Sequence, residues 1–148
     1  MNLFQKLTSL IRRGLTVLAL VGMLGISFSA PAYAATPARF VFEYPPASDQ
    51  FVIELTDESK IQQARNILKG TEKDDTHVLG RIIKTSAPYN PKWSNQLDPA
   101  SISFFGYAIE VCDARIGYVE DHLDEVGGAF LPGGFWCPWN SRLVKEIQ

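Results

Sequence analysis

Two proline-rich loops carry the side chains in this sequence that are best suited to binding a ligand. The first loop contains Tyr89 and Trp93, and the second contains Trp136 and Trp139. Tyrosine and tryptophan anchor peptides or stack on sugars because their rings offer a large, rigid contact area at little entropic cost. The positions of these rings predict an aromatic cleft, provided that the fold brings the two loops together.

Four polar residues near these loops are candidates for the rim of the cleft: Asp98, Glu110, Asp113 and Arg142. The carboxylates also suit acid–base catalysis or calcium binding. However, their spacing matches no calcium-binding loop, and hydrogen bonding in a turn or at a strand end is the commoner use of such residues. We therefore expect a polar rim, with no catalytic residue, metal or other cofactor.

Cys112 and Cys137 are the only cysteines of the chain. In an exported protein they are expected to form a disulfide, which stabilises a loop of this length by about 3 kcal/mol in the chain-entropy description. The alternative is a nucleophilic Cys112 that is activated by His77 or His122. The disulfide is favoured because a catalytic thiol would have to escape oxidation by the second cysteine.

Charge and missing motifs exclude several classes of function. Residues 1–34 carry three basic and no acidic side chains, so the other 114 residues have eleven basic and sixteen acidic ones, a formal charge of −5. Nucleic acids and anionic membranes are poor partners for such a chain because both require a basic surface. The sequence also lacks the G-x-S-x-G, H-E-x-x-H and phosphate-binding glycine motifs of serine hydrolases, zinc proteases and nucleotide-binding proteins.

Residues 1–34 have the order of a secretory signal peptide. A basic start is followed by an uncharged run from Gly14 to Phe28 and by the small-x-small triplet Ala32-Tyr33-Ala34. The run is shorter than the roughly 20 apolar residues that a membrane anchor requires. We therefore predict cleavage after Ala34 and a single secreted or periplasmic domain at residues 35–148.

The first part of that domain predicts a β-hairpin followed by a helix. Apolar side chains alternate with polar ones in residues 39–44 and 51–55, which is typical of two strands with one buried face. Thr56 is the expected N-cap of a helix that ends at Gly70.

The remainder predicts further strands and a second helix. β-branched residues indicate a strand at 77–85. In residues 101–112 the apolar side changes near Gly106, as at a β-bulge, so that Phe105, Tyr107, Ile109 and Val111 would share one strand face. Helical spacing from Ile116 to Val126 and a final strand at 141–147 complete an α+β domain. We expect an antiparallel sheet of four to five strands, two helices on one face and one disulfide.

The second predicted helix carries four acidic residues: Glu120, Asp121, Asp124 and Glu125. Such a run usually forms a solvent-exposed face. His122 lies among them, but one histidine without an evident second ligand is a weak indication of a metal site. We therefore expect no metal here.

Four motifs, in this order, resemble a small secreted bacterial domain that is related to the N-terminal domain of a slime-mould calmodulin-binding protein. They are Tyr89-Asn90-Pro91-x-Trp93-Ser94, Leu97-Asp98-Pro99, Ile109-Glu110-Val111-Cys112-Asp113 and Trp136-Cys137-Pro138-Trp139-x-Ser141-Arg142. The likeness covers residues 39–148. The family pattern favours an aromatic residue and a histidine before Leu97, where this chain has Asn95-Gln96, so any role of that histidine is absent here.

The resemblance implies calmodulin binding only through the name of the relative. Calmodulin targets are basic amphipathic helices, whereas the first predicted helix has mixed charge and the second is acidic. An exported protein would also not meet a cytosolic sensor. The resemblance therefore informs the fold more than the activity.

We expect a secreted, non-enzymatic binding module whose aromatic cleft recognises a peptide or a glycan. A small protease inhibitor is the first alternative, because disulfide-braced, proline-rich loops are pre-organised for an active site. A small hydrolase that uses Glu110 or Asp113, or Cys112 with a histidine, is the second. The expected partner is an extracytoplasmic peptide, protein or glycan, not nucleic acid or a membrane.

Overall fold

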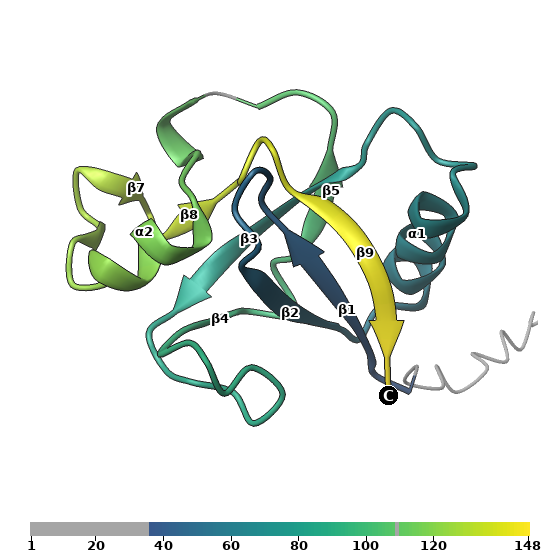
Figure 1. The fold of residues 1–148 in the computed structure, drawn as a ribbon, viewed down its shortest axis with the longest axis horizontal. Coiled ribbons are helices and arrows are strands. Elements are labelled where there is room, and N and C mark those ends of the chain that lie inside the picture. Colours follow the sequence, from purple (N-terminus) through teal and green to yellow (C-terminus); the bar gives the residue numbers. More distant parts are fainter. Residues whose placement is uncertain (1–35, 109) are drawn as a thin grey trace, which may run out of the picture. The chain divides into compact units, whose positions relative to one another are not determined.

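The computed structural model describes residues 36–108 and 110–148, and Figure 1 shows their helices and strands. The predicted signal peptide and its cleavage site lie outside the described residues. In chain order the elements are β1 (Ala38–Glu43), β2 (Gln50–Leu55), α1 (Glu58–Lys69), β3 (His77–Ile83), β4 (Gln96–Leu97), β5 (Ser103–Phe105), the 3₁₀ helix η2 (Glu110–Cys112), α2 (Ile116–Asp121), β6 (Val126–Gly127), β7 (Phe130–Pro132), β8 (Phe135–Trp136) and β9 (Arg142–Ile147).

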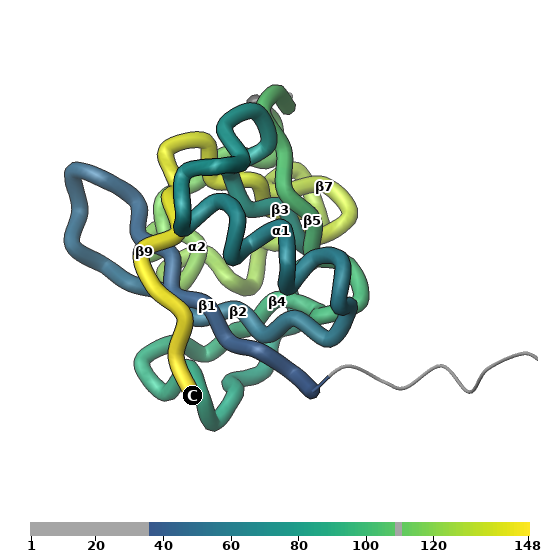
Figure 2. The backbone as a smooth tube through the Cα atoms, turned by 90° about the vertical axis from the view of Figure 1, so that its right-hand side faces the viewer, coloured from purple at the N-terminus to yellow at the C-terminus, as the bar shows by residue number. Residues whose placement is uncertain are grey.

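The strands form two antiparallel sheets and one short parallel pair. The first sheet has the order β2-β1-β9, the second is built on β3, which pairs with β4, β5 and β8, and β6 pairs with β7 in parallel. Figure 1 shows α1 beside β9 and α2 at the opposite end, with β7 and β8, and Figure 2 looks onto the side of the domain that carries α1. The α+β class, with antiparallel sheets, two helices and a disulfide, is confirmed. The strands are divided between two antiparallel sheets and a parallel pair, and the two helices do not share one face.

The predicted hairpin is confirmed and supplies much of the core. In the register of β1 and β2, Phe40 faces Ile53 and Phe42 faces Phe51. All four side chains are fully buried, and they belong to the same cluster as Ile61 of α1. Alternation in the sequence therefore identified the buried face correctly, because side chains of a strand point to its two faces in turn.

The first helix forms as predicted, but its N-cap is Asp57 and not Thr56. Asp57 has an extended backbone, and its carboxylate accepts hydrogen bonds from the backbone N–H groups of Ser59 and Lys60 at 2.8 and 3.2 Å. Because hydrogen bonds from Ser59 and Lys60 favour the charged form, the pKa of Asp57 lies below its usual value. Gly70 ends the helix with a φ of 73°, in the left-handed region that glycine tolerates.

The strand predicted at 101–112 is wrong beyond Phe105. A Cβ atom placed on Gly106 would lie 2.3 Å from the carbonyl oxygen of Asp74. Only glycine, which has no Cβ atom, therefore fits at this position. Gly106 therefore marks a close approach of two backbones rather than a β-bulge. Tyr107 and Val111, predicted on one strand face with Phe105, lie outside the strand.

The second helix is shorter than predicted. It ends at Asp121, and the chain continues through turns with hydrogen bonds from Glu125 N to the carbonyl oxygen of His122 at 3.0 Å and from Gly128 N to that of Glu125 at 3.1 Å. Val126, the last apolar residue of the predicted helix, lies in β6. The strands predicted at 77–85 and 141–147 are present as β3 and β9.

Candidate functional site

The loop that contains Tyr89 and Trp93 covers the free edge of β2. Trp93 Nε1 donates to the carbonyl oxygen of Gln50 at 2.8 Å, and the backbone N–H of Val52 donates to Asn90 Oδ1 at 3.2 Å. These side chains satisfy backbone groups that would otherwise pair with a further strand. Trp93 is only 6% exposed, so it serves the sheet edge rather than a ligand.

Glu120 holds this loop from α2. Its two carboxylate oxygens each accept a hydrogen bond from the backbone N–H of Ser94 at 3.0 Å, and Oε2 also accepts one from Asn95 Nδ2 at 2.9 Å. Burial raises the pKa of Glu120, but these hydrogen bonds outweigh it, and the net pKa lies below the usual value. The prediction of a solvated face is therefore wrong for Glu120, whereas Asp121, Asp124 and Glu125 are exposed.

Tyr89 lies half-buried on the outside of β1. The guanidinium of Arg39 sits 4.9 Å from the centre of its ring, and its hydroxyl donates to Gln96 Oε1 at 3.1 Å. Burial and the nearby charge of Glu54 raise the pKa of Tyr89. Gln96 therefore orients Tyr89 by a hydrogen bond.

Trp136 belongs to the core and does not line a cleft. It is 0% exposed, its Nε1 donates to the carbonyl oxygen of Ala114 at 2.9 Å, and its ring lies 5.6 Å from that of Phe42 and 5.3 Å from that of Phe51. Large rings fill the core where two loops meet the sheet. The predicted cleft of four rings is therefore wrong, since Trp93 and Trp136 both pack inward on Phe51.

The predicted disulfide is confirmed, with the Cα atoms of Cys112 and Cys137 5.1 Å apart. Its formation rules out Cys112 as a thiol nucleophile in this structure. Asp113, next in the chain, accepts hydrogen bonds from the backbone N–H of Trp139 at 2.9 Å and from the hydroxyl of Tyr44 at 3.4 Å. Asp113 therefore joins the loop after β8 to the end of β1, which is a structural use of its carboxylate.

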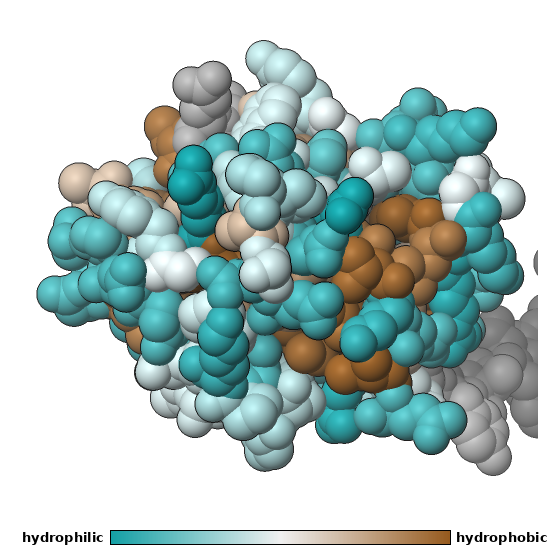
Figure 3. Space-filling model, in the orientation of Figure 1, coloured by the Kyte–Doolittle hydropathy of each residue, from teal (hydrophilic) through white to brown (hydrophobic). Residues whose placement is uncertain are grey.

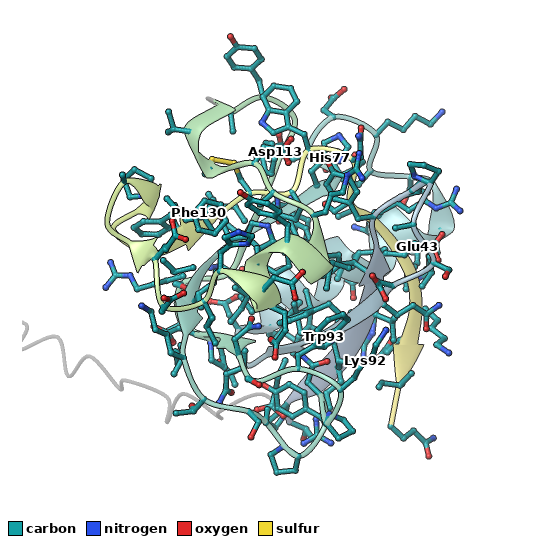
Figure 4. All side chains as sticks on the ribbon, turned by 60° about the vertical axis from the view of Figure 1, so that its left-hand side comes forward. Glu43, His77, Lys92, Trp93, Asp113 and Phe130 are labelled. Atoms are coloured by element: carbon teal, nitrogen blue, oxygen red, sulfur yellow. A yellow bond between two sulfur atoms is a disulfide. The ribbon has the colours of Figure 1, made fainter. Side chains whose placement is uncertain are left out.

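The other predicted rim residues do not gather around one site. Asp98 accepts a hydrogen bond from the backbone N–H of Ala100 at 3.0 Å and closes a turn, and Arg142 Nε donates to Glu43 at 2.8 Å across β1 and β9. The side chain of Glu110 lies outside what the structure describes. Figure 4 shows Asp113 toward one end of the domain and Trp93, with Lys92, toward the other.

Exposed apolar side chains flank the disulfide instead. Tyr107 is 85% exposed and Val111 is 60% exposed. The ring of Tyr107 meets that of Trp139 edge to face at 5.7 Å, and Trp139 in turn meets Phe105 at 5.9 Å. We call Tyr107, Val111 and Trp139 the aromatic ridge. Sequence reasoning missed the exposure of Tyr107 and Val111, because their alternation was typical of a buried strand face.

Large exposed apolar side chains are concentrated in one half of the domain. Among the described residues they are Ile83, Tyr107, Val111, Tyr118 and Phe135. They lie in or next to β3, η2, α2 and β8, whereas β1, β2, α1 and β9 contribute none. The 3₁₀ helix η2 also contacts β7. Among the described residues, the large apolar side chains with the greatest exposure therefore all lie in this half.

A further apolar area lies on the face of the domain that is turned toward the viewer in Figure 1. Figure 3 shows it next to α1 and β9. The half-buried apolar side chains of these two elements, Ile67, Leu68, Val144 and Ile147, are aliphatic. Aliphatic side chains lack the rings that dominate binding hot spots. The aromatic ridge is therefore the stronger candidate site.

The described residues contain no group of three metal-ligating side chains, and none of their helices is long and apolar enough to cross a membrane. Comparison with curated proteins and with solved structures found no match. The family model described as the BP-74 N-terminal domain matches residues 36–148, which is the stretch that carries the four motifs. The chain therefore belongs to the BP-74 N-terminal domain family.

Proposed function

We propose that this domain is a binding module that recognises a peptide segment of a protein partner through the aromatic ridge. The observation that carries the proposal is the 85% exposure of Tyr107 beside the disulfide. A tyrosine so exposed contributes little to the core, and exposed aromatic clusters commonly mark interaction surfaces. Membership of this family of N-terminal domains agrees with a binding module.

The ridge is braced from both sides. The disulfide fixes the end of η2, and Asp113 fixes the backbone of Trp139 at 2.9 Å. Bracing lowers the entropy lost on binding, by about 0.5–1.5 kcal/mol for each side chain that is already ordered. Such a surface suits a partner that docks without a large rearrangement of the domain.

A peptide fits the surroundings of the ridge better than a glycan does. Sugar sites need free hydrogen-bonding groups directly around the stacking ring, but Asp113, the carboxylate that contacts the Trp139 backbone, already accepts two hydrogen bonds. Val111 adds aliphatic contact area. The carboxylates of Asp74 and Asp75 are exposed, and these two residues lie next to Gly106, one residue before Tyr107. We therefore expect a peptide with an apolar anchor residue next to a basic one.

We also propose that the domain acts outside the cytoplasm, where a disulfide persists. The signal-like sequence of residues 1–34 supports export. Expression in a secreting host tests this: mass spectrometry of the released protein should give Ala35 as the first residue. Retention of the full chain inside the cell would contradict export.

The binding function is tested by selecting peptides from a random library on the purified residues 35–148. The selected peptides should bind Tyr107→Ser at least about 10-fold more weakly than the unaltered domain, as expected for a hot-spot tyrosine. Tyr118→Ser is the matched control, since Tyr118 is also an exposed tyrosine but lies outside the ridge. Circular dichroism and thermal unfolding of both variants check that the fold is unchanged.

Three outcomes would overturn the proposal. Peptides that bind Tyr107→Ser and the unaltered domain equally would place the site elsewhere. If the domain bound glycans on an array but no peptide, the ligand would be a sugar instead of a peptide. Inhibition of a protease panel at micromolar concentration, lost in Tyr107→Ser, would favour the inhibitor alternative.

A further inference from the structure

A second group of rings lies apart from the ridge and has no role in the proposed function above. Tyr118, His122 and Phe130, which we call the ring cluster, come from α2, the turn after it and β7. The rings of Tyr118 and His122 stack with centroids 4.0 Å apart, and the imidazole Nδ1 donates to the carbonyl oxygen of Tyr118 at 3.0 Å. Even with one face covered, Tyr118 remains 51% exposed.

The three ring separations show where Phe130 lies. Its centroid is 5.4 Å from that of Tyr118 and 6.1 Å from that of His122. If Phe130 covered the other face of Tyr118, its distance to His122 would approach the sum of the two shorter separations. Phe130 therefore lies beside the stack, with its plane at 80° to that of Tyr118. Neither His122 nor Phe130 therefore covers the outer face of Tyr118, and Phe130 borders that face at the ring edge; we call this place the corner.

The backbone that presents Phe130 is unusual. Leu131, the next residue, has a φ of 47° although it is not glycine, and it is only 1% exposed. A left-handed backbone is costly for a leucine, and such conformations persist where the surrounding structure imposes them. Burial of Leu131 thus holds Phe130 at the surface, where Figure 4 shows it.

The charge around the corner is negative. Residues 116–130 contain four acidic and no lysine or arginine side chains. Glu120 turns inward to Ser94, but Asp121, Asp124 and Glu125 are exposed. The Lys84 ammonium reaches this segment and donates to the carbonyl oxygen of Asp124 at 3.2 Å. The three exposed carboxylates outnumber this one ammonium group, so the surface keeps a negative charge that attracts a cation.

We infer that the ring cluster binds a quaternary ammonium group in the corner between Tyr118 and Phe130. The face of an aromatic ring attracts a cation through its quadrupole, and the uncovered face of Tyr118 offers a flat contact for the methyl groups of a quaternary ammonium. The exposed carboxylates add long-range attraction without direct contact. No free carboxylate in the corner itself is required.

Choline chloride is the probe, titrated into residues 35–148 with nuclear magnetic resonance of the aromatic side chains as the readout. The neutral isostere 3,3-dimethylbutan-1-ol has the same shape without the charge. Choline should shift the Tyr118 and Phe130 signals and bind about 10-fold more tightly than the isostere, within the range of cation–π interactions. Equal binding of both compounds would mean a hydrophobic site only and would overturn the inference.

Variants locate the site and separate it from the ridge. Tyr118→Leu should reduce choline binding about 10-fold, Tyr118→Phe should retain it because the ring remains, and Tyr107→Leu should leave it unchanged. The triple change Asp121→Asn, Asp124→Asn and Glu125→Gln should weaken binding at low salt while the rings stay in place. Unchanged binding by Tyr118→Leu, or no choline-induced shift at all, refutes the ring cluster as a cation site and leaves the ridge proposal untouched.

Discussion

Replacement of Trp136 by phenylalanine tests the assignment of this residue to the core. The indole is fully buried between Phe42 and Phe51, and its Nε1 donates to the carbonyl oxygen of Ala114. The variant leaves a cavity where the larger ring was and a buried carbonyl oxygen without its partner. The unpaired carbonyl alone costs about 1–3 kcal/mol, and the lost ring volume adds roughly 1–2 kcal/mol.

The expected loss is therefore about 3 kcal/mol in the free energy of unfolding, which lowers Tm by roughly 12 °C for a domain of this size. Trp139→Phe is the matched control, because Trp139 is half-buried and its Nε1 has no hydrogen-bond partner among the described residues. That variant should cost less than about 1 kcal/mol. Urea unfolding followed by far-ultraviolet circular dichroism measures both.

Equal destabilisation by the two variants would refute the reasoning, since it would show that burial and the indole hydrogen bond do not distinguish the two tryptophans. A stable Trp136→Phe domain that has lost peptide binding would restore Trp136 as a ligand contact. Both readouts come from the same purified proteins.

Three further predictions concern the loops. The lowered pKa of Glu120 contributes stability that is present above the unfolded-state pKa and lost as the pH falls through the folded-state pKa, so Glu120→Gln should flatten the acid limb of the stability profile below about pH 4.5. Gly106→Ala should destabilise the domain in thermal unfolding, because its Cβ would lie 2.3 Å from the carbonyl oxygen of Asp74; an unchanged Tm would contradict the close approach. Replacing Cys112 and Cys137 by serine should cost about 2–5 kcal/mol in urea unfolding, and an undiminished free energy would show that the bridge is dispensable.

The loop that covers the edge of β2 explains why residue type misled the prediction of the cleft. Tyrosine, tryptophan and asparagine are common in binding sites, and the same groups also satisfy a sheet edge. Trp93 and Asn90 bond to the backbone of β2 at 2.8 and 3.2 Å. The sequence does not show that β2 is an edge strand. β2 lies at the edge because β9 pairs with β1 and not with β2, and that pairing is decided by the fold.

Local patterns determined the parts of the fold that depend on neighbours in the chain. The hairpin follows from alternation, the end of α1 follows from Gly70, and the disulfide follows from two cysteines in a chain with a signal-like start. Each of these is decided by side-chain periodicity, backbone freedom or the count of one residue type.

Long-range packing decided the candidate sites. Strand β5 ends at Phe105 because Gly106 meets the backbone of Asp74. Tyr107 and Val111 lie beyond the end of this strand and are exposed. In the same way, a ring is buried or exposed according to which segments pack on it, as Trp136 and Trp139 show although only two residues separate them in the chain. Composition placed aromatic residues in these loops, but only the meeting of distant segments determined which rings remain open to a ligand.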